Sequence, residues 1–369
     1  MYFNKILLSR LSEENEVRKI QFTGRSTYIL SLPKRWMNDM HLKPGDPVTI
    51  IREINNSLSI VPNAIRKPVS INEVTAFMLQ DQNGNSLKRK VVSMYLAGYN
   101  IMHLKSKAGR ITSLQRDAVR EVVRRNLVGT EIIADASDLI TVQVLLNLPE
   151  LSVNTAVRRM FLISTAMHKD AMISIAEQNQ DLAGTILKSD DEVDRFSLYI
   201  LRNLVMATKN ERMLQEIGLS SPSDSLSYRV AVRSIERVAD HAAGIANKCL
   251  KITEKISKDV LQKLDRMSRM SLSLLNDSVE AFLQRDYYLA DSIVDKTVSI
   301  RSMENEIIQV LDKTSSTTTR ESTNVQIKLI LEDIRRTAEH ASDIAEAAMN
   351  ETVSEVIEKI TIHDNGVPI

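Results

Sequence analysis

Residues 151–350 contain one three-helix pattern twice, and this internal repeat limits the possible folds of the chain more than any other feature. Residues 159–200 align with residues 266–307 at an offset of 107 without a gap, and residues 235–246 (IERVADHAAGIA) align with residues 334–345 (IRRTAEHASDIA) at an offset of 99. The 8 residues by which the offsets differ fall in the loop before the third helix. Two copies of a helical unit predict an all-helical C-terminal half.

Apolar residues in this region recur at the spacing of helices that bury one face, for example at Met160, Ile163 and Met167. We interpret the methionines as core residues rather than as a cofactor site, and the single cysteine, Cys249, as a buried thiol. Long helices joined by short breaks pack antiparallel into a bundle. Six helices are expected from the five breaks, which fall at Gln180–Gly184, Gly218–Asp224, Thr253–Ser257, Arg285–Tyr288 and Thr314–Glu321.

Residues 17–61 alternate short apolar runs with turn residues, a pattern typical of four short strands. The runs are VRKIQFT, STYILSLP, PVTIIREI and SLSIVP, with one or two helical turns at PKRWMNDM, a sharp turn at Gly45 and a hairpin turn at Asn55-Asn56. A segment of about 45 residues with four strands buries too little apolar surface to be stable alone. We therefore expect the chain to dimerise through this segment.

Between these two regions, residues 87–146 predict a small α/β connector in the order helix, strand, helix, strand, strand. Its helices are basic, since residues 86–126 carry 10 Lys and Arg against only Asp117 and Glu121, and these cations either form a solvated face or contact phosphate groups. The expected architecture is multidomain. It comprises a β-domain at 1–66, the connector at 67–148, helical repeats at 149–252 and 253–352, and a tail at 353–369.

The formal net charge of +1 hides a strong asymmetry. Residues 1–126 hold 21 Lys and Arg against 10 Asp and Glu, whereas residues 127–369 hold 27 against 37. A basic module predicts a polyanionic partner and an acidic module predicts cations or basic partners, while the alternative is two ordinarily solvated surfaces. No apolar run approaches the roughly 20 residues that span a bilayer, so we expect a cytoplasmic protein without membrane insertion.

Two motifs in the helical repeat are those of a known family. SDDEVDRFSLYILRN, from Ser189, and RSIERVADHAAGIAN, from Arg233, match a (D/E)xxxD helix and an E-R-x-A-D-H-A-x-x-I-A helix. Through these motifs residues 151–350 resemble the phosphate-uptake regulator (PhoU) family, whose fold is a tandem of three-helix repeats. The resemblance implies a six-helix bundle that senses phosphate status, through a phosphate transporter or a signalling protein as its partner.

The N-terminal segment is similar to the AbrB/SpoVT DNA-binding domain. The similarity rests on a strand that ends in Leu32-Pro33-Lys34 and on an L-x-x-G-D turn from Leu42 to Asp46. It implies a swapped-hairpin β-barrel formed by a homodimer, or alternatively a module that only dimerises the chain. The fusion resembles archaeal phosphate regulators and implies a DNA-binding transcriptional regulator of phosphate metabolism. The residues that match DNA-contacting positions are Arg18, Lys19, Arg25, Lys34 and Arg35.

The PhoU resemblance also implies metal binding through the acidic helix motifs, with Fe, Zn, Mn, Ni or Mg as the ion. Acids at i and i+4 project from the same face of a helix, and hard cations need such convergent oxygens. The alternative is that Arg195, Arg233 and Arg237 neutralise these acids. The matching residues all lie on the first repeat and are Asp190, Asp191, Asp194, Glu236 and Asp240.

The second repeat departs from this acidic pattern. Four of the five acids are replaced there by Thr297, Val298, Arg301 and Arg335, and only Glu339 retains a carboxylate. The sequence therefore predicts at most one metal site per chain. His241 and His340, which occupy matching positions beside an acid, are interpreted as helix-cap or hydrogen-bonding residues.

A DNA-binding regulator and a signalling adaptor that contacts a phosphate transporter or a sensor kinase are both compatible with these modules. A di-iron carboxylate enzyme is not, because its chemistry uses Glu-x-x-His and neither Glu236 nor Glu339 has a histidine three residues on. The sequence also lacks a P-loop, a G-x-S-x-G motif and a metal-type cysteine spacing. We therefore expect that the protein is not an enzyme.

Overall fold

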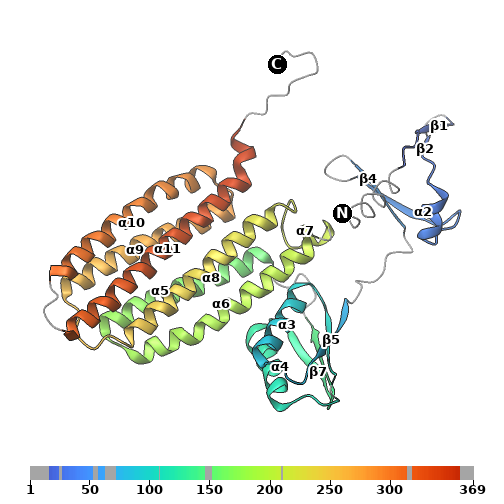
Figure 1. The fold of residues 1–369 in the computed structure, drawn as a ribbon. Coiled ribbons are helices and arrows are strands. Elements are labelled where there is room, and N and C mark those ends of the chain that lie inside the picture. The colour runs from blue at the N-terminus through green and yellow to red at the C-terminus, as the bar shows by residue number, and fades with distance from the viewer. Residues whose placement is uncertain are drawn as a thin grey trace, which may run out of the picture. The chain divides into compact units, whose positions relative to one another are not determined.

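The computed structural model describes residues 16–24, 27–52, 57–62, 72–107, 109–145, 152–208, 211–313 and 318–357. The chain divides into two compact units, residues 1–70 and residues 71–369, and Figure 1 shows the elements that form each of them. The predicted turn at Asn55-Asn56 and residues 314–317 of the last predicted break lie outside the described residues.

Two antiparallel hairpins and one short helix make up the first unit. Pro33 precedes the helix, and its φ of −60° suits the entry to a helical turn. Gly45 has φ +96° and forms the predicted turn, which the Lys43 amide closes by donating to the Asp46 carboxylate at 2.7 Å. The predicted strands and helix are confirmed as β1 (Gln21–Thr23) paired with β2 (Thr27–Ile29), α2 (Lys34–Asp39), and β3 (Val48–Arg52) paired with β4 (Leu58–Pro62).

These hairpins bury little apolar surface. Among the described residues of this unit, Leu42 is the only large hydrophobic side chain that is fully buried. Phe22 and Tyr28 contact each other across the first hairpin with ring centres 5.2 Å apart, yet they remain 59% and 72% exposed, and Ile50 on the second hairpin is 63% exposed. Apolar surface on this scale usually marks an interaction site.

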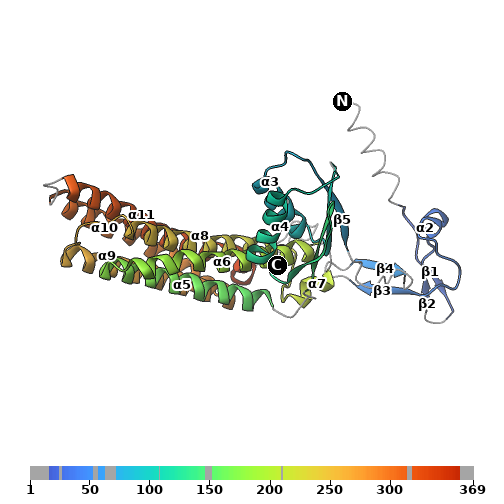
Figure 2. The same cartoon turned by 90° about the horizontal axis from the view of Figure 1, so that it is seen from below.

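The α/β module opens the second unit and contains one strand more than the sequence predicted. Its sheet has the order β5-β6-β8-β7, in which β5 pairs parallel with β6 and the other pairs are antiparallel. The prediction missed β5, although its side chains alternate between exposed and partly buried. Figure 2 shows both helices on one face of the sheet. The elements are β5 (Glu73–Met78), α3 (Gly84–Leu96), β6 (Ile101–Ser106), α4 (Ser113–Asn126), β7 (Thr130–Asp135) and β8 (Leu139–Val144).

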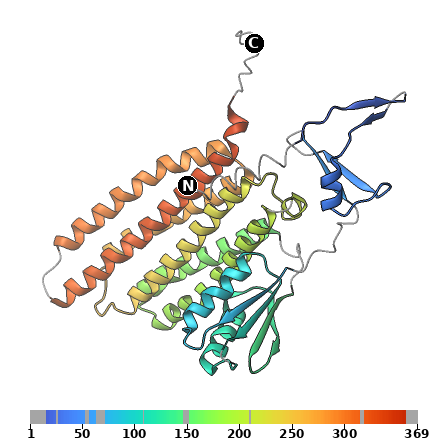
Figure 3. The ribbon, with the colours of Figure 1, turned by 45° about the vertical axis from the view of Figure 1, so that its right-hand side comes forward.

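This module packs against the helical bundle rather than only connecting two domains. Both α3 and α4 contact α6 (Gln180–Ala207) of the bundle, and Figure 3 shows them beside the bundle. At the junction the buried guanidinium of Arg202 donates to the Tyr95 carbonyl and lies 4.8 Å from the centre of the Tyr95 ring. Tyr95 is fully buried, so the contact fixes α3 on the bundle.

The helical bundle contains the six predicted long helices. Within the described residues, no helix combines the length and the apolar character that crossing a bilayer requires. A seventh, short helix, α7 (Glu211–Glu216), was not predicted, and α11 continues four residues into the predicted tail. The long helices are α5 (Val153–Glu177), α6 (Gln180–Ala207), α8 (Asp224–Cys249), α9 (Lys258–Gln284), α10 (Tyr287–Lys313) and α11 (Thr318–Val356).

The predicted break at Gln180–Gly184 is wrong, because these residues belong to α6. The chain turns instead at Gln178, which ends α5 with φ +54°, and Asn179 caps α6 by accepting from the Leu182 amide at 3.0 Å. Gly184 suggested a loop, but it lies inside the helix. The capping asparagine was the better signal, since its side chain satisfies an amide at the start of the helix.

The internal repeat is visible in the backbone and in the core. Gln178 and Arg285, which are equivalent at the offset of 107, both end their helices in the left-handed region with φ +54° and +59°. Ile235 and Ile334, which are equivalent at the offset of 99, are both fully buried, and α8 packs against α11 where the two repeats meet. Cys249 is buried and its thiol donates to the Ser174 carbonyl at 3.1 Å, which confirms it as a core residue.

Replacing Gly98 by alanine should weaken the junction between the α/β module and the bundle. Gly98 has φ +95°, and a Cβ atom there would lie 3.0 Å from Cγ of Met206 on α6. Backbone strain and this contact together should lower the free energy of unfolding by about 2–4 kcal/mol. Gly109→Ala is a matched control, because φ is +84° there and no atom lies within 4 Å, so strain alone should cost about 1–2 kcal/mol. If urea denaturation shows the same loss of unfolding free energy for both variants, the Met206 contact does not contribute to the effect at Gly98.

Candidate functional site

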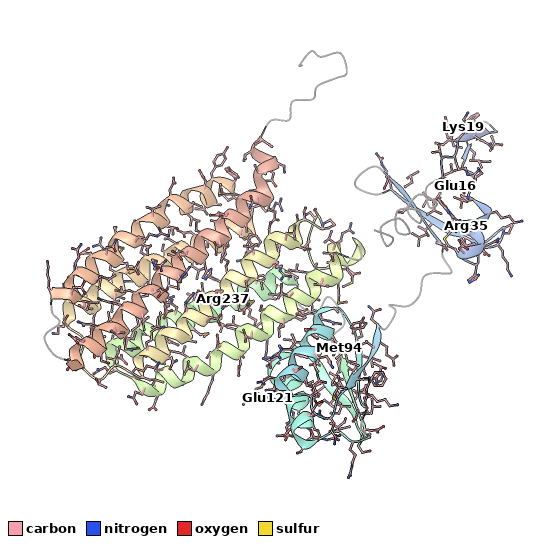
Figure 4. The ribbon with its side chains drawn as sticks, in the orientation of Figure 1. Glu16, Lys19, Arg35, Met94, Glu121 and Arg237 are labelled. Carbon is pink, nitrogen blue, oxygen red and sulfur yellow. The ribbon has the colours of Figure 1, made fainter. Side chains whose placement is uncertain are left out.

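The first unit presents the predicted DNA-contacting cations on two different elements. Arg18 and Lys19 lie just before β1, where Arg18 pairs with Glu16, and Lys34 and Arg35 form the exposed first turn of α2. Figure 4 labels Lys19 and Arg35 at these two places. The fifth predicted residue, Arg25, lies outside the described residues.

Two further exposed cations of this unit were not singled out from the sequence. Lys43 begins the turn at Gly45, and Arg52 ends β3. Their signal was available, because both flank predicted turns of a basic module. Among the described residues the unit therefore carries exposed cations on its first hairpin, on its helix, on the connecting turn and on its second hairpin.

The basic helices of the α/β module use many of their cations internally. Lys88 pairs with Glu121 at 2.6 Å, and Arg120 pairs with Asp135 at 2.9 Å. Arg116 also pairs with Asp135, and the Lys90 ammonium donates to the Phe77 carbonyl at 3.1 Å. Because these cations are already engaged within the module, they are less suited to contact phosphate groups.

The acidic cluster of the first repeat, made up of the five predicted acids, spans two neighbouring helices. Three of its members come from α6 and two from α8, and these helices pack against each other. Asp190, Asp194, Glu236 and Asp240 are partly buried, whereas Asp191 is exposed. The Ser197 hydroxyl donates to Glu236 at 3.4 Å and links the two helices. The fold thus brings the predicted acids to one helix pair.

Two carboxylates of this cluster, those of Asp190 and Asp194, have a raised pKa. Burial is the largest cause for Asp190, followed by the charges of Asp240, Asp191 and Glu236, and together they raise its pKa to about 6. Burial and then the charge of Asp190 likewise raise the pKa of Asp194 to about 6. Both causes favour the neutral form of a carboxylic acid, so the cluster is electrostatically strained near neutral pH.

Among the described residues, arginines pair with the two cluster acids on α8 and with none of those on α6. Arg233 pairs with Glu236, and Arg237, labelled in Figure 4, pairs with Asp240 at 2.8 Å. The Arg195 side chain, in contrast, leaves its Nε without a hydrogen-bond partner. In the part of the chain that the structure describes, no three His, Cys, Asp or Glu side chains converge closely enough to hold a metal ion. A metal would therefore need Glu236 and Asp240 to leave their arginines.

At the equivalent place, the second repeat is a network of arginines around acids, as its sequence indicated. Glu339 is paired with Arg301, Arg335 and Arg336, and Arg335 also pairs with Glu304 at 3.0 Å. These cations lower the pKa of Glu339, although its burial opposes them. The two repeats thus share a backbone and differ in charge, which is the asymmetry that the sequence predicted.

The two predicted histidines make hydrogen bonds, but neither caps a helix. Nδ1 of His241 lies 3.1 Å from Asp333 and Nδ1 of His340 lies 3.0 Å from Asp343, while the two rings stack with centres 5.5 Å apart. Asp333 also accepts from the Lys248 ammonium at 2.6 Å. The two contacts of Asp333 and the stacked rings bind α8 to α11, the third helices of the two repeats, whereas the His340–Asp343 contact lies within α11.

One buried histidine was missed by sequence reasoning. His168 is fully buried on α5, with Nε2 3.0 Å from the Ser268 hydroxyl, and burial lowers its pKa to about 4. It replaces an apolar residue of the repeat, because the equivalent residue is the core Leu275. Comparison of the repeats at this one position could have found it.

Comparison with known families agrees with both modules. The model of the PhoU domain matches residues 157–249 and 264–348, which are the two helical repeats. A model described as antidote-toxin recognition MazE, bacterial antitoxin, matches residues 21–73. The matched ranges therefore separate the strand-rich N-terminal unit from the helical bundle.

Relatives of the bundle carry the same family name. The phosphate-specific transport system accessory protein PhoU homolog 1 of Thermotoga maritima is 28% identical over 197 residues, which cover 51% of this chain and 80% of that protein. The PhoU homolog of Clostridium acetobutylicum is 20% identical over 181 residues, or 49% and 81% of the two chains. PhoU from Pseudomonas aeruginosa shares the fold at a TM-score of 0.50 and 18% identity, over 55% of this chain and 96% of that one. This chain thus joins two PhoU domains, at residues 157–249 and 264–348, to an N-terminal AbrB-type domain.

Proposed function

We propose that the protein is a cytoplasmic, DNA-binding transcriptional regulator of phosphate uptake, and not an enzyme, in which the helical bundle senses phosphate status. The observation that carries this proposal is the joining of an AbrB-type module, with exposed cations and exposed apolar side chains, to two PhoU domains. The relatives named above are accessory proteins of phosphate-specific transport systems, which supports phosphate as the signal.

The N-terminal unit is proposed to form a swapped-hairpin homodimer that carries the DNA surface. The exposure of Phe22, Tyr28 and Ile50 supports this, because a second copy would bury them. A twofold axis would double the exposed cations of the unit, and phosphate neutralisation by such cations dominates non-specific DNA affinity. Among the described residues, no long helix of this unit could enter the major groove, so specificity would depend on DNA shape.

A chain truncated to residues 72–369 should be a folded monomer that no longer binds DNA. The second unit retains both of its hydrophobic cores after this truncation. The full chain should be a dimer in light scattering and should bind duplex DNA with an affinity that falls steeply with salt. A truncated chain that remains dimeric would disprove the swapped hairpin. Maps of bound genomic sites under phosphate-rich and phosphate-poor growth would then test the regulatory role.

The printed names of the relatives also favour a second candidate, a signalling adaptor that contacts a phosphate transporter or a sensor kinase. In that case the N-terminal unit would only dimerise the chain. The two candidates differ in one measurement, because the adaptor predicts a full-length dimer that has no salt-dependent affinity for DNA.

We also propose that the bundle binds a metal ion on its first repeat. Its ligands would be Asp190, Asp194, Glu236 and Asp240, with Asp191 at the rim. The strained carboxylates of Asp190 and Asp194 support it, since a cation would relieve their repulsion. The pairing of Glu236 and Asp240 with arginines opposes it. The alternative is a docking face on which arginines partly neutralise the acids.

A further inference from the structure

A groove of about 500 Å³ lies between α8 and α11, away from the acidic cluster. Figure 1 shows these two helices side by side where the repeats meet. Four carboxylates line the groove, those of Asp224, Asp343, Glu346 and Glu351, and among the described residues that line it there is no lysine, arginine or histidine. Its volume is that of a site for a small ligand or for one or two side chains of a partner.

Two of these acids are buried, and one of them, Glu351, is incompletely satisfied. The Glu351 side chain is only 6% exposed, and its Oε1 is paired with Arg285 while its Oε2 has no hydrogen-bond partner. Burial raises the pKa of Glu351 to about 7, although Arg285 lowers it. Asp224 is 7% exposed and accepts from the amides of Ser220 and Ser221, at 2.9 Å each, with the same oxygen, Oδ2. An unsatisfied buried acceptor costs about 1–3 kcal/mol of stability.

The repeat itself does not require these acids. At the offset of 99, Asp343 corresponds to Gly244, Glu346 to Asn247, and Asp224 to Thr323. Glu351 corresponds to Ile252, an apolar side chain that is 8% exposed. Ile252 lies in the loop just after α8, whereas Glu351 belongs to α11, where its Oε2 is a buried acceptor without a partner. A buried acceptor that the described residues leave unsatisfied points to a ligand.

The walls of the groove indicate the rest of the ligand. Leu226 and Val230, one helical turn apart on α8, line the groove and are 69% and 44% exposed. A small inorganic cation would leave these apolar side chains in water. An arginine or lysine side chain on a polypeptide would place its charge among the acids and its aliphatic stem, together with neighbouring residues, on the apolar wall. A metal ion fits poorly, because no three acids of the described groove converge to hold one.

We propose that the groove between α8 and α11 is a docking site for a basic, amphipathic segment of a partner protein, which inserts an arginine or lysine side chain between Asp224, Asp343, Glu346 and Glu351. This surface goes beyond the proposed DNA binding and does not depend on it. Arginine is the better fit, because its planar guanidinium can pair with two carboxylates at once.

Binding of a synthetic peptide to the full chain tests this proposal. The probe is a fluorescent 12-residue amphipathic helix with leucines on one face and two arginines on the other, and its partner probe carries citrulline in place of arginine. Fluorescence anisotropy at low salt should show binding of the arginine peptide and at least tenfold weaker binding of the citrulline peptide. Equal affinity of the two peptides would overturn the proposal, because the contact would then not depend on charge.

Matched variants locate the site. Asp343→Asn with Glu346→Gln removes two exposed acids of the groove and should weaken the arginine peptide at least tenfold. Asp291→Asn with Asp295→Asn removes two exposed acids from α10 and should change its affinity less than twofold. Equal effects of the two pairs would show a general charge effect and would also overturn the proposal. DNA affinity should be the same in both variants. A failure of the proposed DNA binding would therefore be recognised separately from a failure of the docking site.

A further variant separates docking from folding. Glu351→Ile with Arg285→Gln gives the second repeat the residues of the first, Ile252 and Gln178. This variant should melt at the same or a higher temperature than the wild type and should bind the peptide at least tenfold more weakly. A lower melting temperature would show that Glu351 is structural. Agmatine, which carries a guanidinium on a four-carbon stem, should compete only weakly with the arginine peptide. If agmatine alone binds tightly, the ligand of the groove is a small organic cation and the proposed partner protein is wrong.

Discussion

Reversing the charge of Lys19 and Lys34 together should weaken DNA binding by the full chain about 100-fold at low salt. Both residues are exposed, one before β1 and one on α2, so the change leaves no buried group unpaired. In a dimer the double variant Lys19→Glu, Lys34→Glu alters four positions. If each contacts one phosphate, the slope of log K against log salt should become shallower by about 3–4, since each contact contributes about 0.9.

The control for this experiment is a charge reversal of the same size on the bundle. Lys251 and Lys296 are exposed, so Lys251→Glu with Lys296→Glu changes the net charge equally without touching the N-terminal unit. This control should lower DNA affinity less than threefold, through long-range electrostatics alone. If the two variants behave alike, or if Lys19→Glu, Lys34→Glu binds DNA like the wild type, the N-terminal unit is not the DNA surface. The remaining candidate would then be the basic α/β module.

Replacing Asp190 or Asp194 by asparagine should stabilise the metal-free protein at neutral pH. Their pKa is raised in the folded state from 3.8 to about 6, so the folded protein resists losing these protons more than the unfolded chain does. The contribution of these two acids to stability should therefore fall as pH rises from about 4 to about 6. Each replacement should remove part of this loss and add about 1–2 kcal/mol at pH 7.5, a figure reduced for solvent screening of half-buried groups.

Asp191→Asn is the matched control, because it removes the same charge from an exposed position on the same helix. It should change the free energy of unfolding by less than about 0.5 kcal/mol. The double variant Asp190→Asn, Asp194→Asn should gain less than the sum of the two single changes, since the charge of Asp190 contributes to the raised pKa of Asp194. Urea denaturation at pH 4 and pH 7.5 makes the comparison. If the difference in stability between the wild type and this double variant is the same at both pH values, the arrangement of the cluster is contradicted.

The same variants decide between a metal site and a docking face. If the cluster binds a divalent ion or iron, that ion should raise the melting temperature of the wild type but not that of Asp190→Asn, Asp194→Asn. Glu236→Ala with Asp240→Ala should also abolish the response. Metal binding that survives both double changes would show that the ion binds elsewhere. If the wild type binds no metal, the docking face is the remaining interpretation of the cluster.

The sequence was most informative where a physical pattern repeats. The offset of 107 residues identified the antiparallel bundle, because two copies of one apolar pattern must bury their stripes in the same way. Turn chemistry identified Gly45 as well, since a left-handed residue there is easiest for glycine. Gly184 misled for the opposite reason. A lone glycine inside a strongly amphipathic helix weakens it by only about 1 kcal/mol, which tertiary packing overrides.

The sequence by itself determined which acids and bases share a helix face, and hence the charge difference between the two repeats. Only the tertiary structure decided how these charges are used. Spacing along α8 allowed Arg233 and Arg237 to pair with two acids of the cluster, but it did not reveal that Asp190 and Asp194 stay under strain. Nor does it reveal the groove between α8 and α11, in which Asp224 lies beside acids more than 100 residues further along the chain. Burial and pairing depend on distances across helix interfaces, and those distances exist only once the two repeats have packed together.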